Sequence, residues 1–356
     1  MATPTILFLR SETSDTADSE CTTAVPDKYG YVPPESCNAN YGYYPNFEAN
    51  LAFAVLFGIT LAAHFGQAFF FKKVYAWVAV MGASWELVAF AVRTYGAHNQ
   101  QSLDYVVIGT LFLLLAPLWL NAFCFMTVAR LVYYVVEDQA IWRFKAGRMT
   151  KIFVWLDIIS FLVQAIGGTM LSQEEQDVVD IGQKVYMAGV GFQLAFIIVF
   201  LAIIVKFFLM IRANEVDSPH ANTRRVSILL GSLAACLILI IIRIIYRLIE
   251  FGEGANEDNE LLHSEWYAIC LDGLPMLLAF LVLNVVHPGI VLKGPESEFP
   301  KLTRAEKKQL KQAKKDAKLQ AKKDRKEGGK NVYGYENMTP NSHELLSDTG
   351  RTSPQV

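Results

Sequence analysis

The sequence predicts an all-α membrane protein, a bundle of seven transmembrane helices with the N-terminus outside and the C-terminus in the cytosol. Apolar residues make up 53% of the 356 residues, and the mean hydropathy is +0.28. This is more apolar than is usual for a soluble chain. Seven apolar segments are long enough to cross about 30 Å of hydrocarbon. Basic residues alternate between the connections, which indicates the orientation.

The seven predicted spans follow one another with short connections. The third contains Pro117, which removes a helix hydrogen bond and interrupts an otherwise apolar run. The expected bounds are Phe47–Phe71, Val74–Tyr95, Tyr105–Val136, Ile152–Leu171, Val185–Ile211, Val226–Glu250 and Trp266–Leu292.

Lysine and arginine mark the connections that we expect in the cytosol, where basic loops are retained. The second and sixth connections have no basic residue, and the fourth has only Lys184. We therefore expect an exterior segment 1–46, a membrane domain 47–292 and a cytosolic tail 293–356. The first, third and fifth connections carry Lys72 and Lys73, then Arg143, Lys145, Arg148 and Lys151, then Arg212, Arg224 and Arg225.

The five cysteines divide between these regions. Cys21 and Cys37 lie in the exterior segment, where a disulfide would close a loop of about fifteen residues and stabilise the fold by about 3 kcal/mol. Cys124, Cys236 and Cys270 lie in spans, as small apolar residues do. No cysteines or histidines have zinc-ligand spacing, and neither G-x-x-x-x-G-K-[ST] nor H-E-x-x-H occurs. We expect no metal, no cofactor and no enzymatic activity.

The tail is strongly basic. Lys301–Glu327 contains twelve lysines or arginines against four acidic residues. Its composition favours a solvated helix, and its charge attracts anionic lipids of the inner leaflet by about 1 kcal/mol per basic residue near the surface. We expect these lipids, and not nucleic acid, to be its partners.

Charged residues inside the spans are the candidates for function. Each charge at mid-bilayer costs about 2.5–3.5 kcal/mol, so such residues face partners or a wet cavity. Counted from the outer face, seven of them form an outer cluster around a predicted substrate-binding cavity. In the inner part, Arg130 and Asp157 come to similar depth and are predicted to form a structural ion pair. The alternative for the outer cluster is a clamp in which every charge is paired internally. The seven residues are Glu86, Arg93, Arg243, Arg247, Glu250, Glu265 and Asp272.

The order of several motifs over the seven spans resembles the fungal lipid-translocating exporters, the family named for resistance to aminocholesterol. The match runs from Tyr41 to Gly289, although the Gly-Tyr element that the family carries after Glu86 is missing. The motifs that carry the resemblance are Tyr41-Gly-Tyr-Tyr-Pro45, His64, Glu86 with Arg93-Thr-Tyr95, Ala116-Pro117, Ala129-Arg130-Leu131, Asp157 with Gln164 and Gly167-Gly168, Gly189-Val-Gly-Phe-Gln193, the series Arg243, Arg247, Glu250, Gly252 and Gly254, Glu265-Trp-Tyr267, Asp272 and His287-Pro288-Gly289.

This resemblance implies a plasma-membrane protein that moves amphipathic lipids, such as sphingoid bases and sterol-like amines, or confers tolerance to them, with links to stress and drug resistance. An excess carboxylate, Glu265 or Asp272, would then receive the amine of the lipid. We expect the amide variants of both residues to fold normally and to transport poorly. Two alternatives stay open, a seven-span receptor or sensor of lipid or membrane stress and a scaffold that acts through partners.

The predicted orientation is tested by accessibility in intact cells. A membrane-impermeant thiol reagent should label a cysteine placed in segment 1–46 and should not label one placed in the tail after Lys301, because only the former is exterior. Labelling of the tail in sealed cells would contradict the orientation.

Overall fold

A computed structural model describes two units of the chain, Met1–Phe299 and Pro300–Val356. The described residues are 22–33, 36, 38–142, 144–171, 173, 175–213, 222–252, 264–294 and 299 of the first unit, and 312–313, 315–316 and 319 of the second. Cys21 and Cys37, and with them the predicted disulfide, lie outside the described residues, as does most of the basic segment Lys301–Glu327.

The first unit contains seven helices that are long and apolar enough to span a membrane, which confirms the predicted all-α, seven-span class. Two short strands, β1 (Ala140–Ile141) and β2 (Phe144–Lys145), pair antiparallel between α3 and α4. Short 3₁₀ turns are η2 (Val74–Ala76) and η4 (Pro288–Ile290). The helices are α1 (Phe47–Phe71), α2 (Trp77–Ala97), α3 (Leu103–Val135), α4 (Ala146–Met170), α5 (Gln176–Arg212), α6 (Thr223–Gly252), and α8 (Glu265–Ala268) continued by a π-helical turn (Ile269–Gly273) and α9 (Leu274–Val285).

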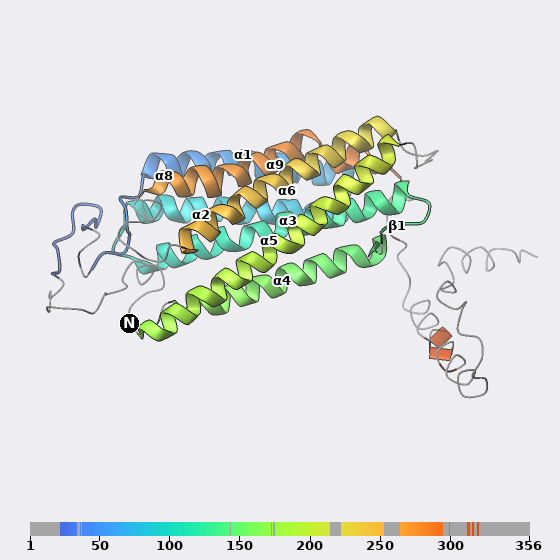
Figure 1. The fold of residues 1–356 in the computed structure, drawn as a ribbon. Coiled ribbons are helices and arrows are strands. Elements are labelled where there is room, and N and C mark those ends of the chain that lie inside the picture. The colour runs from blue at the N-terminus through green and yellow to red at the C-terminus, as the bar shows by residue number, and fades with distance from the viewer. Residues whose placement is uncertain are drawn as a thin grey trace, which may run out of the picture. The chain divides into compact units, whose positions relative to one another are not determined.

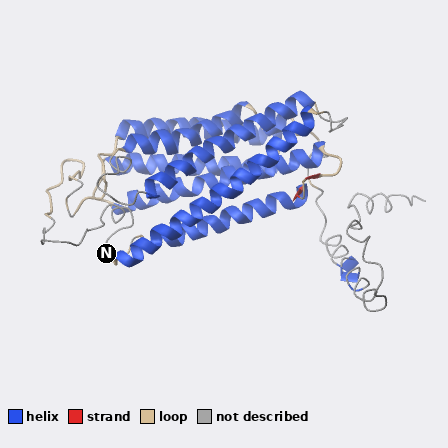
Figure 2. Ribbon diagram, viewed as in Figure 1, coloured by secondary structure: helices blue, strands red, loops and turns tan. Residues whose placement is uncertain are grey.

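The helices form one bundle in which each packs against the next in the chain (Figure 1). Contacts between α1 and α9 close the ring, and α3 meets α6 across its interior. Helices make up nearly all of the described bundle, as Figure 2 shows. Apolar side chains such as Phe57, Phe123 and Phe280 are fully buried between the helices, while others such as Ile59 and Leu162 face outward. That outward apolar surface is what a helix presents to lipid.

Helix α3 continues through Pro117 as a single element, from Leu103 to Val135. Proline has no backbone N–H, so it cannot donate to the carbonyl four residues earlier. In α3 that carbonyl belongs to Leu113. The proline therefore leaves a polar backbone atom in the bundle interior that needs another partner.

The last span changes its winding where it enters the bundle. Pro275 cannot donate to the carbonyl of Leu271, and the π-helical turn Ile269–Gly273, in which donors reach five residues back, lies beside it. This widened turn contains Asp272, which is fully buried. The π-helical turn beside Pro275 thus contains the buried Asp272.

The segment before α1 packs on the end of the bundle where α2 ends and α3 begins. The Asn40 side chain donates to the carbonyl of Gln100 at 3.0 Å. His98 lies stacked between two rings, 4.3 Å from Tyr29 and 4.1 Å from Phe47. We call this end of the bundle the N-terminal end.

Glycines bring α4 and α5 close together. A Cβ on Gly167 would lie 2.4 Å from the backbone nitrogen of Tyr186, and one on Gly189 would lie 2.8 Å from Cγ of Gln164. Small residues of this kind allow helix backbones to approach in membranes. The close approach sets Gln164 on α4 beside Gln193 on α5, with 3.1 Å between the two amides.

Adjacent glycines on α4 provide a matched test of this packing. Gly167→Ala should lower stability by about 1–3 kcal/mol because the added methyl overpacks the contact with α5. Gly168→Ala should be neutral or stabilising, because a Cβ there meets no atom within 4 Å and alanine favours a helix. Thermal unfolding of the two purified variants compares them. Equal melting temperatures would contradict the close contact.

Candidate substrate-binding site

The centre of the charged site is Asp272, held by two arginines of α6. Nε of Arg243 donates to one carboxylate oxygen, and Nη2 of Arg247 donates to the other. Arg243 and Arg247 are one helical turn apart, so both reach the same partner. Asp272 is fully buried, and Arg243 is 6% exposed. Two charge-assisted hydrogen bonds therefore join α6 to the last span.

Arg243 also connects α6 to α3. Its Nη2 donates to the carbonyl of Leu113 at 2.9 Å. This is the carbonyl that Pro117 leaves without a helix partner. A guanidinium with five donors can serve the carboxylate and the carbonyl together. One side chain thus stabilises three spans.

Glu250 completes the α6 network. Its carboxylate accepts from Nη1 of Arg247 at 3.0 Å and from the hydroxyl of Tyr246 at 3.1 Å. Residues three and four apart on a helix are surface neighbours, which explains this local contact.

A second network lies at the N-terminal end. Nη2 of Arg93 donates to Oε1 of Glu265 at 3.2 Å, and Nδ2 of Asn50 donates to the same oxygen at 2.8 Å. The other oxygen, Oε2, accepts from the backbone N–H of Asn46, the residue that caps α1. This network ties α1 and α2 to the start of the last span.

Tyr43 extends this second network into the segment before α1. Its hydroxyl accepts from Nη2 of Arg93 at 2.8 Å. Burial raises the pKa of the Tyr43 hydroxyl, although the nearby Arg93 lowers it in part. The phenol therefore stays neutral at physiological pH and acts as a fixed acceptor for the arginine.

We call the six charged residues of these two networks the ion-pair frame. It contains three arginines and three carboxylates, so its formal charge is balanced. Glu265 and Asp272 are each satisfied by several donors, which makes them poor receivers of a further amine. That one of them is the excess carboxylate stays a prediction, and these hydrogen bonds argue against it, because counting charges cannot show which carboxylates are already bonded. The frame consists of Arg93, Arg243, Arg247, Glu250, Glu265 and Asp272.

Glu86 is the one predicted site residue that has no partner among the described residues. It lies in the middle of α2 and is fully buried, and both carboxylate oxygens lack a hydrogen bond. The charged groups that act on it electrostatically are Arg243, Asp272 and Arg247 of the frame. Burying a carboxylate without a partner costs free energy, and at Glu86 no hydrogen bond from the described residues offsets that cost.

The structure also corrects the predicted ion pair between Arg130 and Asp157. Asp157 accepts from the amide of Asn121 at 3.1 and 3.2 Å and from the amide of Gln193 at 2.9 Å. Arg130 lies nine residues beyond Asn121 on α3, about 13 Å further along the helix. Its guanidinium is 4.1 Å from the ring centre of Tyr75 and donates to the carbonyl of Met126. Counting residues from the outer face placed the two charges at one depth. In the structure, Asp157 lies at the level of Asn121 instead.

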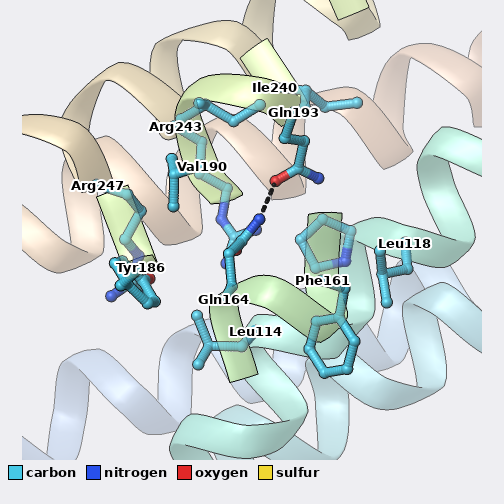
Figure 3. Close-up of a pocket in the computed structure, with 12 residues that line it drawn as sticks. Leu114, Leu118, Phe161, Gln164, Tyr186, Val190, Gln193, Ile240, Arg243 and Arg247 are labelled. Carbon is cyan, nitrogen blue, oxygen red and sulfur yellow. Dashed lines mark hydrogen bonds between the residues drawn. The ribbon is translucent and has the colours of Figure 1, made fainter. Parts of the chain in front are cut away.

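A cavity lies between α3, α4, α5 and α6, bordered by two members of the frame (Figure 3). The volume of the cavity that is open to water is about 30 Å³, which is enough for about two water molecules. Of the seven predicted site residues only Arg243 and Arg247 line it, together with Gln164, Gln193 and Tyr186. The cavity is thus smaller and less charged than the substrate cavity predicted from the sequence. Among the described residues no group of three or more His, Cys, Asp or Glu side chains is placed to hold a metal ion.

The sequence of the bundle matches a known family over most of its length. Residues 79–295 match the family described as RTA1 like protein. The chain belongs to the RTA1-like family. No solved structure matches it.

Three curated relatives of this RTA1-like chain are fungal proteins. The probable lipid transporter atnI of Emericella nidulans is 40% identical over 83% of this chain and 79% of its own length. The sphingoid long-chain base transporter RSB1 of Saccharomyces cerevisiae is 25% identical over 73% of this chain and 76% of its own. Protein RTA1 of the same yeast is 29% identical over 70% and 85%. Two of these three relatives, atnI and RSB1, are named as transporters.

Several residues of the site were not predicted from the sequence. Asn50, Asn46 and Tyr43 complete the Glu265 network, and their roles depend on how residues 38–46 fold onto the bundle. The free carbonyl of Leu113 could have been predicted from the sequence, because a proline in a helix leaves the carbonyl four residues earlier without its helix donor. That Arg243 is its partner could not. Gln193 appeared only within a family motif, and its contact with Asp157 depends on how α5 packs against α4.

The frame predicts a strong effect of neutralising Asp272. Asp272→Asn should lower the free energy of unfolding by about 3–5 kcal/mol, because the buried Arg243 loses its carboxylate and Arg247 keeps only Glu250. Asp104→Asn, at an exposed position in the first turn of α3, serves as the control and should cost about 1 kcal/mol or less. Thermal unfolding and folded yield in detergent measure both. An Asp272→Asn protein as stable as the control would show that the frame is not structural.

Proposed function

We propose that this protein moves amphipathic lipids with a basic headgroup, such as long-chain amines, across the membrane, and that Glu86 receives the headgroup. The names of the relatives support the substrate class. The observation that carries the proposal is the fully buried Glu86 carboxylate with no partner among the described residues.

Charge and hydrogen bonding favour Glu86 as the receiving group. The six members of the ion-pair frame balance one another, so adding Glu86 gives the set one negative charge in excess. An ammonium group supplies one positive charge and three N–H donors, like the lysine side chain. Bound at Glu86, it would offset the charge and satisfy both oxygens by charge-assisted hydrogen bonds.

Apolar walls for the lipid chain lie beside Glu86. Phe90, one turn further along α2, stacks with Phe57 at 5.4 Å and with Phe53 at 5.1 Å between ring centres. Phe57 also meets Phe280 of α9 at 6.2 Å. These rings lie between α1, α2 and α9. Their faces can also attract a cation.

Loading a lipid requires the helices to separate. The cavity between α3 and α6 holds about two waters, which is far below the several hundred cubic ångströms of typical ligand sites. Because α1 and α9 close the ring of the bundle, a movement between them would open a path from the lipid to Glu86. We further propose the plasma membrane as the location, the exterior for the N-terminal end, and anionic inner-leaflet lipids as partners of the basic tail.

Neutralising Glu86 separates transport from folding. Glu86→Gln should slow the movement of a labelled long-chain amine in proteoliposomes by about tenfold or more, since a hydrogen bond to a charged group contributes about 1.5–3 kcal/mol. Its melting temperature should equal or exceed that of the unmodified protein, because a neutral amide replaces an unpartnered buried carboxylate. The stability change is thus opposite in sign to that of Asp272→Asn.

The control variant is Glu48→Gln, an exposed carboxylate in the first turn of α1. The control ligand is the N-acylated form of the same amine, which has the same chain but no positive charge. Normal transport of the amine by Glu86→Gln would exclude the proposed role. Binding of the amine without any movement would favour the receptor or sensor alternative.

A further inference from the structure

Asp157 is a buried carboxylate outside the ion-pair frame, and only neutral groups contact it. It lies near the middle of α4 and is 2% exposed. Its two oxygens accept three hydrogen bonds, two from Asn121 of α3 and one from Gln193 of α5. A carboxylate at such a depth normally pairs with a cation or carries a proton.

The carbonyl oxygen of Asn121 has an unused hydrogen-bonding capacity at the same place. This atom, Oδ1, is buried and has no partner among the described residues, because the amide presents its NH₂ group to Asp157. Turning the amide by about 180° would present Oδ1 to the carboxyl group instead. A protonated Asp157 has one O–H donor and would then donate it to Oδ1. The two orientations of one amide therefore match the two protonation states.

A row of amides leads from the cavity to Asp157. The Gln164 amide nitrogen donates to the Gln193 carbonyl oxygen, as the dashed line in Figure 3 shows, and the Gln193 nitrogen donates to Asp157. Both glutamines line the cavity that accommodates about two waters. Water in the cavity is thus separated from Asp157 by one glutamine side chain.

No charged side chain of the neighbouring helices contacts Asp157 among the described residues. From α3 it faces Asn121, with Arg130 about 13 Å further along that helix. From α5 it faces Gln193, and the other titratable groups that line the same cavity are Tyr186 of α5 and Arg243 and Arg247 of α6, none of which contacts Asp157. Among the described residues around Asp157, only one further acceptor, Oδ1 of Asn121, is without a partner, whereas hard metal ions take six or more oxygens. The geometry therefore suits a proton and not a metal ion.

We propose that Asp157 is a proton-binding site, switched by the Asn121 amide and reached from the cavity through Gln193, and that its protonation is coupled to lipid movement. In this step a water-borne proton binds to a carboxylate oxygen, the carboxylate becomes a carboxylic acid, and the new O–H bonds to Oδ1 of Asn121. The coupling rests on the proposed transport function, but the proton site does not.

Infrared difference spectroscopy of the purified protein between acidic and alkaline pH tests the site without transport. Between about pH 6 and 9, a range in which exposed carboxyl groups stay ionised, a protonated-carboxyl band should appear at the lower pH. Its Asp157 component should be missing from Asp157→Asn and should remain in Glu86→Gln, which removes the other buried carboxyl outside the frame among the described residues. In Asn121→Leu the band should move to higher frequency, because the acceptor of the O–H is gone. An unchanged band in both Asp157→Asn and Asn121→Leu, or no band in the unmodified protein, would overturn the site. A band that depends on sodium and not on pH would also overturn it.

Transport under an imposed pH gradient tests the coupling. The unmodified protein should move the labelled amine several-fold faster with a gradient than without one, and Asp157→Asn should move it at a rate that the gradient does not change. Because the pH of a vesicle also redistributes free amines, protein-free vesicles under the same gradient are the reference. Equal gradient effects in the two proteins would exclude the coupling. If neither protein moves lipid, the proposed function fails, while the infrared result still decides the proton site.

Discussion

A charge without a partner inside a membrane is costly, and the structure offsets this cost most completely at Asp272. Two arginines of α6 share its carboxylate, and one of them, Arg243, also bonds the carbonyl that Pro117 frees on α3. Three spans are therefore held by one group of side chains. Removing one partner from such a buried group leaves a charge without compensation, which costs more free energy than the pair itself contributes. We therefore expect the three spans to stay together.

Because the ion-pair frame is balanced, we propose that the carboxylates outside it carry the function. Glu86 has no partner and Asp157 has only amides among the described residues, and both lie near the middle of their helices. The cavity between α3, α4, α5 and α6 is lined by Arg243 and Arg247 of the frame and by Gln193, which contacts Asp157. A transporter needs both a rigid scaffold and a few buried charged groups that a substrate or a proton can neutralise.

The sequence predicted the spans well, because an uninterrupted run of about 20 apolar residues is long enough to cross the hydrocarbon core and is rare in soluble proteins. It also identified six of the charges that pair in the structure. It could not predict the pairings themselves. Arg130 and Asp157 were matched by depth, yet Asp157 meets Asn121, a partner set by the register of α3 against α4. Glu265 was predicted to bind a ligand because nothing in the sequence shows that the backbone N–H of Asn46, just before α1, already donates to its carboxylate.

The central claim is that the frame is structural and that Glu86 binds the lipid headgroup. The most direct test is photo-crosslinking of the reconstituted protein with a long-chain amine that carries a diazirine next to the nitrogen, followed by mass spectrometry of the labelled peptides. We predict label on the α2 peptide that contains Glu86, and its loss when an unlabelled amine competes. Label confined to peptides around Glu265 or Asp272, with α2 unmodified, would contradict this claim.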